Sequence, residues 1–73
     1  MKNNYFPKIT VRAARINSGK TQKQVANELG ISESTYIRWE KDPSIISAKH
    51  QKDLEKIFNF PIELIIFLPQ NTS

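Results

Sequence analysis

The chain has 73 residues and a formal net charge of +4, with 11 lysines and arginines against 7 aspartates and glutamates. This length allows one domain around one small core, and the basic excess favours a polyanionic partner. With no cysteine and a single histidine, the sequence excludes a disulfide framework and argues against a zinc site or a histidine-based catalytic centre. It also lacks a glycine-rich phosphate loop and a nucleophile–base pairing, so we expect no enzymatic activity, no cofactor and no bound metal.

The N-terminal stretch MKNNYFPKIT has no apolar core, so it is not a signal peptide. No apolar run elsewhere is long enough to cross a bilayer, and we expect a cytoplasmic protein without a membrane partner. Residues 1–8 are expected to form a flexible arm, because they are polar apart from Tyr5 and Phe6 and because Pro7 discourages a helix. The two aromatic rings can lean on the core.

A first helix is expected to begin at Ile9 or Thr10 and to end at residue 17, with the Thr10 hydroxyl able to cap it. Val11 and Ala14 give this helix a narrow inner face, and Gly19 follows its end.

Residues 22–40, QKQVANELGISESTYIRWE, read as two short helices joined by a tight turn. Gly30 follows the apolar residues of the first helix, and glycine most easily takes the left-handed conformation in which a helix ends. Ser32 can cap the second helix, expected over residues 32–41. Ala26 has to be small because the second helix crosses the first at this point. The core of the unit is expected to consist of Val25, Ala26, Leu29, Gly30, Ile31, Tyr36 and Trp39.

This spacing resembles the DNA-binding helix-turn-helix of the Cro and phage-repressor family, also called the XRE family. The resemblance extends over about residues 9–66 and implies an all-α fold, a compact bundle of five short helices like the DNA-binding domain of lambda repressor. The alternative is a plain helical hairpin in a small bundle, but such a hairpin has no need for a glycine turn with a polar, basic outer face. The matching residues are Gln22, Val25, Ala26, Leu29, Gly30, Ile31, Ser32, Tyr36, Trp39 and Glu40.

Beyond the second helix of this unit, the Asp-Pro-Ser sequence at 42–44 breaks the chain, since a residue before proline disfavours helix. A fourth helix is expected over residues 48–58, with Ser47 as its cap. A last short helix is expected over residues 61–66, because Pro61 suits the first helical position.

The run of residues 62–68 is almost entirely apolar, and a short helix can bury only part of it. The remainder should either fold back on the core or meet a second molecule. The DNA-binding domain is therefore expected to span residues 9–68, followed by a frayed tail at 69–73.

The resemblance implies that the N-terminal half of helix 32–41 meets base edges in the major groove, through Glu33, Ser34 and Arg38. Arg38 can donate two hydrogen bonds to guanine, and Ser34 can donate or accept, so that it discriminates little. Glu33 could accept from the amino group of cytosine, but it could equally repel phosphate or only favour the helix N-terminus. Ile37 is expected to face outward, where it could touch a thymine methyl or serve as a protein interface residue.

Phosphate contacts are expected at the start of the helix that begins near Gln22, where free backbone N–H groups favour an anion. Gln22 matches the family glutamine that contacts the DNA backbone. For Lys23 the alternative is a solvated charge with no partner. The residues expected to contact phosphate are Thr21, Gln22, Lys23, Asn27 and Lys41.

The resemblance also assigns a structural role to Arg15, which in lambdoid repressors pairs with the glutamate that closes the recognition helix, here Glu40. An arginine can grip a carboxylate in a fork and so hold the first helix to the third. The alternative is two unrelated surface charges.

The leading hypothesis is a sequence-specific, double-stranded DNA-binding transcriptional regulator of Cro type, from a phage or prophage, which acts on DNA in a bacterial cell without a small-molecule ligand. One such module makes few contacts, so we expect a homodimer on operator half-sites about 34 Å apart. The alternative is a protein-binding modulator that complexes with a partner repressor and alters its DNA binding. The residues expected at a protein interface are Ile37, Ile65, Ile66, Phe67 and Leu68.

Overall fold

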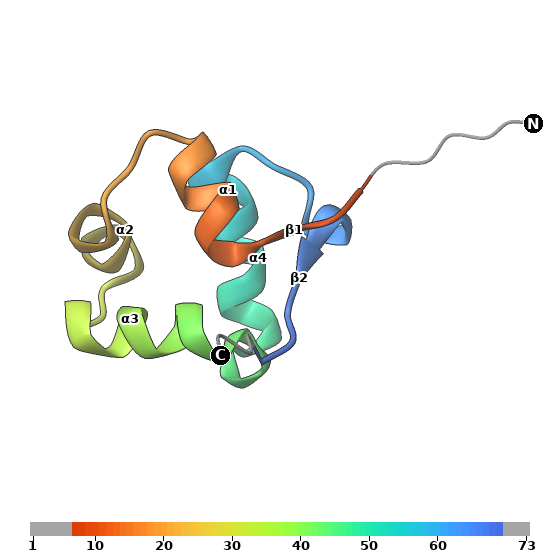
Figure 1. The fold of residues 1–73 in the computed structure, drawn as a ribbon. Coiled ribbons are helices and arrows are strands. Elements are labelled where there is room, and N and C mark those ends of the chain that lie inside the picture. Colours follow the sequence, from red (N-terminus) through yellow and green to blue (C-terminus); the bar gives the residue numbers. More distant parts are fainter. Residues whose placement is uncertain (1–6, 70–73) are drawn as a thin grey trace, which may run out of the picture.

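The structure is a computed structural model that describes residues 7–69, and its elements are mostly short helices (Figure 1). The first six residues of the expected arm, with Tyr5 and Phe6, and residues 70–73 of the expected tail lie outside the described range. In chain order the elements are β1 (Ile9–Thr10), α1 (Val11–Asn17), α2 (Gln22–Leu29), α3 (Glu33–Lys41), the 3-10 turn η1 (Pro43–Ile45), α4 (Ala48–Phe58), the 3-10 turn η2 (Ile62–Leu64) and β2 (Ile65–Ile66).

Each α-helix begins at a hydroxyl side chain that accepts a hydrogen bond from the backbone N–H three residues later. Such a cap satisfies a donor that has no partner within the helix and stabilises a helix by about 1 kcal/mol. The expected helix over residues 48–58 is confirmed, with Ser47 as its cap, whereas α1 begins at Val11 rather than at Ile9 or Thr10. The four caps are Thr10, Thr21, Ser32 and Ser47.

The turn between α2 and α3 has the conformation that Gly30 predicts. Gly30 has a φ of 75°, in the left-handed region that glycine adopts without strain. The N–H of Ile31 donates to the Ala26 carbonyl at 3.0 Å, which closes the end of α2. The chain therefore turns within two residues, and Ser32 starts α3 directly afterwards.

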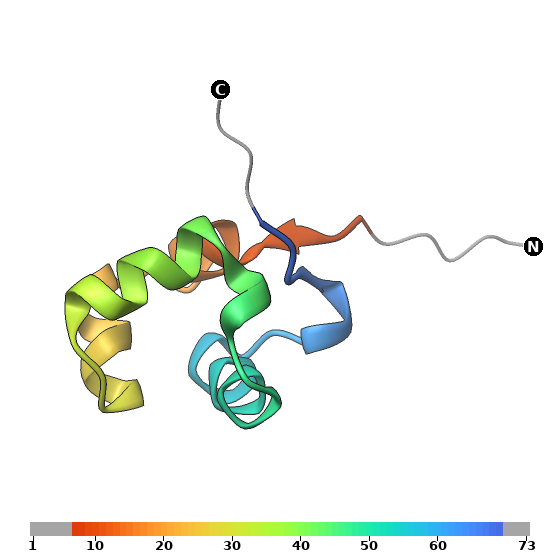
Figure 2. The ribbon, with the colours of Figure 1, turned by 90° about the horizontal axis from the view of Figure 1, so that it is seen from below.

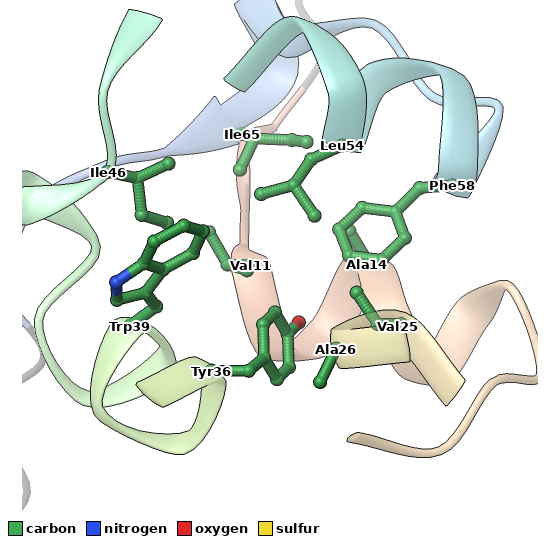
Figure 3. Close-up of a cluster of buried hydrophobic side chains, with 10 residues drawn as sticks. All are labelled: Val11, Ala14, Val25, Ala26, Tyr36, Trp39, Ile46, Leu54, Phe58 and Ile65. Carbon is green, nitrogen blue, oxygen red and sulfur yellow. The ribbon is translucent and has the colours of Figure 1, made fainter. Parts of the chain in front are cut away.

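The core lies where α1, α2, α3 and α4 converge, and Figure 3 shows the side chains that fill it. Tyr36 and Leu54 are fully buried. Helices α2 and α3 pack directly against each other, and Ala26 of α2 lies beside Tyr36 of α3 (Figure 3). The sequence did not indicate that Ile46, which follows η1, also lies in the core. The buried apolar residues are Val11, Ala14, Val25, Ala26, Tyr36, Trp39, Ile46, Leu54, Phe58 and Ile65.

The expected fifth helix over residues 61–66 is wrong. Within the described range, a single 3-10 turn at Ile62–Leu64 follows Pro61, and the next two residues form the parallel strand β2, which pairs with β1 in the register Ile9↔Ile65 and Thr10↔Ile66. β-branched isoleucines favour extended backbone, and β1 supplies the partner. The fold is therefore mostly helical with a two-stranded sheet at the chain ends, as both views show (Figures 1 and 2).

The pairing places Ile65 in the core, where it is 4% exposed. The expectation that Ile65 belongs to a protein interface is therefore wrong. Of the same segment, Ile66 and Phe67 are half-buried and Leu68 is 63% exposed. Part of the apolar run folds back on the core, and its end stays on the surface.

None of the helices within residues 7–69 has the length and apolar character needed to cross a bilayer.

The contact between α2 and α3 generates a prediction for Ala26, which is 1% exposed. We expect Ala26→Leu to lower the free energy of unfolding by about 1–3 kcal/mol or more, because the added atoms must displace α3. The same change at the exposed Ala13 of α1 is the matched control and should leave stability nearly unchanged. Thermal melts followed by circular dichroism measure both; a wild-type melting curve for Ala26→Leu would contradict the packing described here.

Candidate nucleic-acid interface

Helix α3 has a buried face and an open polar face. Tyr36 and Trp39 point into the core, whereas Glu33, Ser34 and Arg38 are exposed. Figure 2 looks onto α3 from below, and no other described element passes in front of it. The three residues expected to read bases are thus on the accessible side of one helix, with α2 packed behind it.

Two other residues of α3 are only partly accessible. Thr35 is half-buried and its Oγ1 accepts a hydrogen bond from the Ser32 hydroxyl at 2.8 Å. Ile37 is half-buried as well, so the expectation of an exposed apolar side chain there is wrong. Among the described residues, the large apolar side chains that are mostly exposed are Ile16, Ile45 and Leu68.

The structure brings Arg15 and Glu40 together. Arg15 Nε donates to Glu40 Oε2 at 2.6 Å and Nη2 donates to Oε1 at 3.4 Å, the fork that an arginine forms with a carboxylate. The two side chains are 11% and 4% exposed. The hydrogen bonds that Arg15 donates to Glu40 are the main reason why the pKa of Arg15 is raised above its ordinary value.

Two further hydrogen bonds extend this pair into a network. Gln22 Nε2 donates to Glu40 Oε1 at 3.0 Å, and Arg15 Nη1 donates to the Lys20 carbonyl at 3.0 Å. We call these four residues the Glu40 network; it joins α1, the α1–α2 turn, α2 and the end of α3. A buried carboxylate is stable only when its charge and lone pairs are satisfied, and here three N–H groups point at it.

The sequence indicates Gln22 only as a phosphate contact and gives no sign of its bond to Glu40. No local pattern connects these residues, since 18 positions separate them. An amide nitrogen carries two hydrogens, so one N–H of Gln22 remains for a phosphate after the bond to Glu40. Gln22 is half-buried at the first position of α2, and its orientation is fixed by the network.

The start of α2 offers fewer free backbone donors than expected. The Thr21 N–H donates to the Gln24 side chain at 2.8 Å, and the Gln24 N–H donates to Thr21 Oγ1 at 3.0 Å. This capping box leaves the N–H groups of Gln22 and Lys23, which have no partner within the helix. The remaining side chains expected at phosphates, Thr21, Lys23, Asn27 and Lys41, are all exposed.

The side chain of Lys20, by contrast, pairs with an acidic residue of α2. Its Nζ lies 2.7 Å from Glu28 Oε2 in a partly exposed ion pair along α2. Such pairs contribute little to stability, but this one reduces the positive charge beside the α1–α2 turn.

The hydroxyl of Tyr36 is buried beside the Glu40 network and has no hydrogen-bond partner among the described residues. Burial, and secondarily the Glu40 carboxylate, raise the pKa of this phenol above its ordinary value of 10.0. Tyr36 is therefore neutral in the folded protein at every pH at which the protein is ordinarily handled.

Within residues 7–69, no three histidine or acidic side chains lie close enough together to hold a metal ion.

Comparison with known proteins assigns the chain to a family. A family model described as "Helix-turn-helix" matches residues 11–65, from the first residue of α1 to the first residue of β2. No curated protein and no solved structure gives a significant match.

The buried phenol of Tyr36 generates a prediction for alkaline pH. Because its folded pKa lies above the unfolded value of 10.0, its contribution to stability is complete below about pH 10 and is lost as the pH rises further. Tyr36→Phe cannot ionise, so its free energy of unfolding should fall less steeply above about pH 10 than that of the wild type. At pH 7 the two proteins should agree within about 1 kcal/mol, because the hydroxyl has no partner to lose.

Urea unfolding at pH 7 and at alkaline pH measures this difference, and every other ionisable group is common to both proteins. Parallel pH profiles would show that Tyr36 does not titrate as described. A large destabilisation of Tyr36→Phe at pH 7 would show that the hydroxyl is hydrogen-bonded.

Proposed function

We propose that this protein is a sequence-specific regulator of Cro type, since the chain belongs to the XRE family of helix-turn-helix DNA-binding transcription regulators. The observation that carries the proposal is the open face of α3, where Glu33, Ser34 and Arg38 are exposed while the opposite face is buried in the core. A helix presented in this way fits the major groove of B-form DNA, which is about 12 Å wide. The family acts by binding DNA rather than by catalysis, and we propose no enzymatic activity here.

In this mode the N-terminal half of α3 meets the base edges. Arg38 can donate to O6 and N7 of one guanine, and a good bidentate contact discriminates by about 1–3 kcal/mol. Glu33 accepts a hydrogen bond from a cytosine amino group, or its negative charge mainly stabilises the N-terminus of α3. These base contacts determine which DNA sequence is bound, whereas the phosphate contacts fix the register of the protein on the duplex.

The phosphate contacts come from the start of α2 and the end of α3. Gln22 donates its second amide hydrogen, and the N–H groups of Gln22 and Lys23 point toward an anion at the end of the helix. Further phosphate contacts in this proposal come from the exposed side chains of Thr21, Lys23, Asn27 and Lys41. Because Gln22 is held by Glu40 at 3.0 Å, its position relative to α3 is fixed before DNA binds.

We further propose that two copies bind one operator, on half-sites about 34 Å apart. A shallow apolar hollow of about 450 Å³ lies beside β2 and is lined by Lys8 and residues 65–68. Because Ile65 is part of the core, the contact between copies would be made by Ile66, Phe67 and Leu68. We place this dimer on phage or prophage DNA in the cytoplasm of a bacterium.

The same hollow supports a second candidate function, a modulator that binds a partner repressor and alters its DNA binding. An apolar surface of this kind fits a protein partner as well as a second copy, and the acidic Glu33 on α3 disfavours phosphate. In this role the protein would form a stable complex with a repressor encoded beside it.

A gel-shift experiment separates the two functions. The full chain is tested on the intergenic DNA beside its own gene, alone and with any neighbouring repressor. Binding by the protein alone that weakens steeply with added salt supports the regulator, because phosphate contacts release counterions. No binding alone, together with a stable complex with the repressor, supports the modulator.

Arg38→Ala tests the proposed reading of bases. We expect operator affinity to fall by about 1–3 kcal/mol and the preference for guanine to disappear at one base pair, because a bidentate contact is lost. Arg12→Ala removes the same charge from an exposed site on a different helix, α1, so it should leave base preference intact. Selection of binding sites from a random duplex pool measures both; an unchanged sequence preference for Arg38→Ala would rule out its role.

A further inference from the structure

Three hydroxyl groups are linked at the start of α3. The Ser32 hydroxyl accepts from the Thr35 N–H at 3.1 Å as the helix cap, and it donates to Thr35 Oγ1 at 2.8 Å. Ser34 Oγ lies 3.2 Å from Ser32 Oγ, a separation at which one of the two hydroxyls donates to the other. Ser34 is exposed on the face of α3 that we assign to base reading.

The direction of the Ser34–Ser32 bond follows from the number of hydrogens. A serine hydroxyl has one hydrogen to donate and two lone pairs to accept with. Ser32 uses its hydrogen on Thr35 Oγ1 and one lone pair on the Thr35 N–H, so only a lone pair is left for Ser34. Ser34 must therefore be the donor, and its own hydrogen points back toward Ser32.

We propose that this relay, from Ser34 through Ser32 to Thr35, makes Ser34 an acceptor toward DNA and so a specificity-determining residue. With its hydrogen held by Ser32, Ser34 presents lone pairs to the groove and selects a base edge that carries an amino group. In the major groove that edge belongs to cytosine or adenine, whereas guanine and thymine offer acceptors at the corresponding position. The inference rests on the proposed function, in which α3 enters the major groove.

The relay fixes which residues on the exposed face of α3 accept hydrogen bonds from DNA and which donate them. Glu33 and Ser34 at the start of α3 both accept, and Arg38, one helical turn further along, only donates. The half-site should therefore carry cytosine or adenine on the strand that Ser34 approaches and a guanine opposite Arg38. From residue types alone Ser34 could donate or accept, and only the contacts of Ser32 remove that ambiguity.

The decisive variant is Thr35→Val, which keeps the branched shape of a half-buried side chain and removes the oxygen that receives the Ser32 hydrogen. Ser32 can then donate to Ser34, which frees the Ser34 hydrogen for a base acceptor. We expect the preference for cytosine or adenine over guanine or thymine to fall by about 3- to 10-fold, the effect of one neutral hydrogen bond. Thr35→Ser retains the oxygen and is the matched control, with the wild-type preference.

The experiment is selection of binding sites by the full chain from a random duplex pool, run first on the wild type and then on the variants. Ser34→Ala identifies the base pair that Ser34 reads, since its preference there should vanish. Thr35→Val should relax preference at that same base pair and at no other. Should Thr35→Val fail to fold, Ser32→Gly removes the same link with only a few tenths of a kcal/mol lost from the cap, and it should relax the same base pair.

Each outcome is decisive. A wild-type preference for guanine or thymine at the Ser34 position, or an unchanged preference in both Thr35→Val and Ser32→Gly, would overturn the relay while leaving the regulator intact. Ser34→Ala with no altered position would remove Ser34 from base reading. If the wild type enriches no sequence at all, the proposed function fails, and the relay fails with it.

Discussion

The carboxylate of Glu40 is the point on which the geometry of this molecule depends. It is the buried acidic side chain of the described core, only 6% exposed as a residue, and it accepts hydrogen bonds from α1 through Arg15 and from α2 through Gln22. Because a buried charge is tolerated only with its partners in place, the three helices have little freedom to change their mutual angles. The last turn of α3 is thereby fixed in relation to α1 and α2.

The two faces of α3 therefore have different roles. The inner face supplies Tyr36 and Trp39 to the core and Glu40 to the network, so the position of the helix does not depend on its outer residues. The side chains on the outer face can therefore differ without moving the helix. Ser32 has two roles, since it caps the start of α3 and it forms the hydrogen bond that orients the Ser34 hydroxyl. Gln22 likewise has two roles, since one amide hydrogen is donated to Glu40 and the other is available for a phosphate.

The features that the sequence predicts well are those determined locally. Hydroxyl caps such as Ser47, the left-handed Gly30 and the spacing of Tyr36 and Trp39 each depend on a few neighbouring residues, and the helix bounds follow from them. The features that it missed depend on distant partners. A largely apolar run such as residues 62–66 suits a helix or a strand, and the extended form of Ile65–Ile66 is stabilised by β1, more than fifty positions earlier. The Gln22–Glu40 bond likewise joins residues 18 positions apart and follows from three-dimensional placement. The hydroxyl relay is local in sequence, but residue types alone do not show which hydroxyl donates.

The role of the Glu40 network in recognition is tested by the operator affinity of Glu40→Gln, with the folded fraction measured in the same samples by near-ultraviolet circular dichroism of the aromatic residues. The substitution keeps the size of the side chain and removes the charge that holds Arg15. If the network fixes α3 for recognition, the folded variant binds operator at least about tenfold more weakly, or 1.4 kcal/mol. Wild-type affinity in a folded Glu40→Gln protein would contradict the account, because α3 would then be held in place without the network.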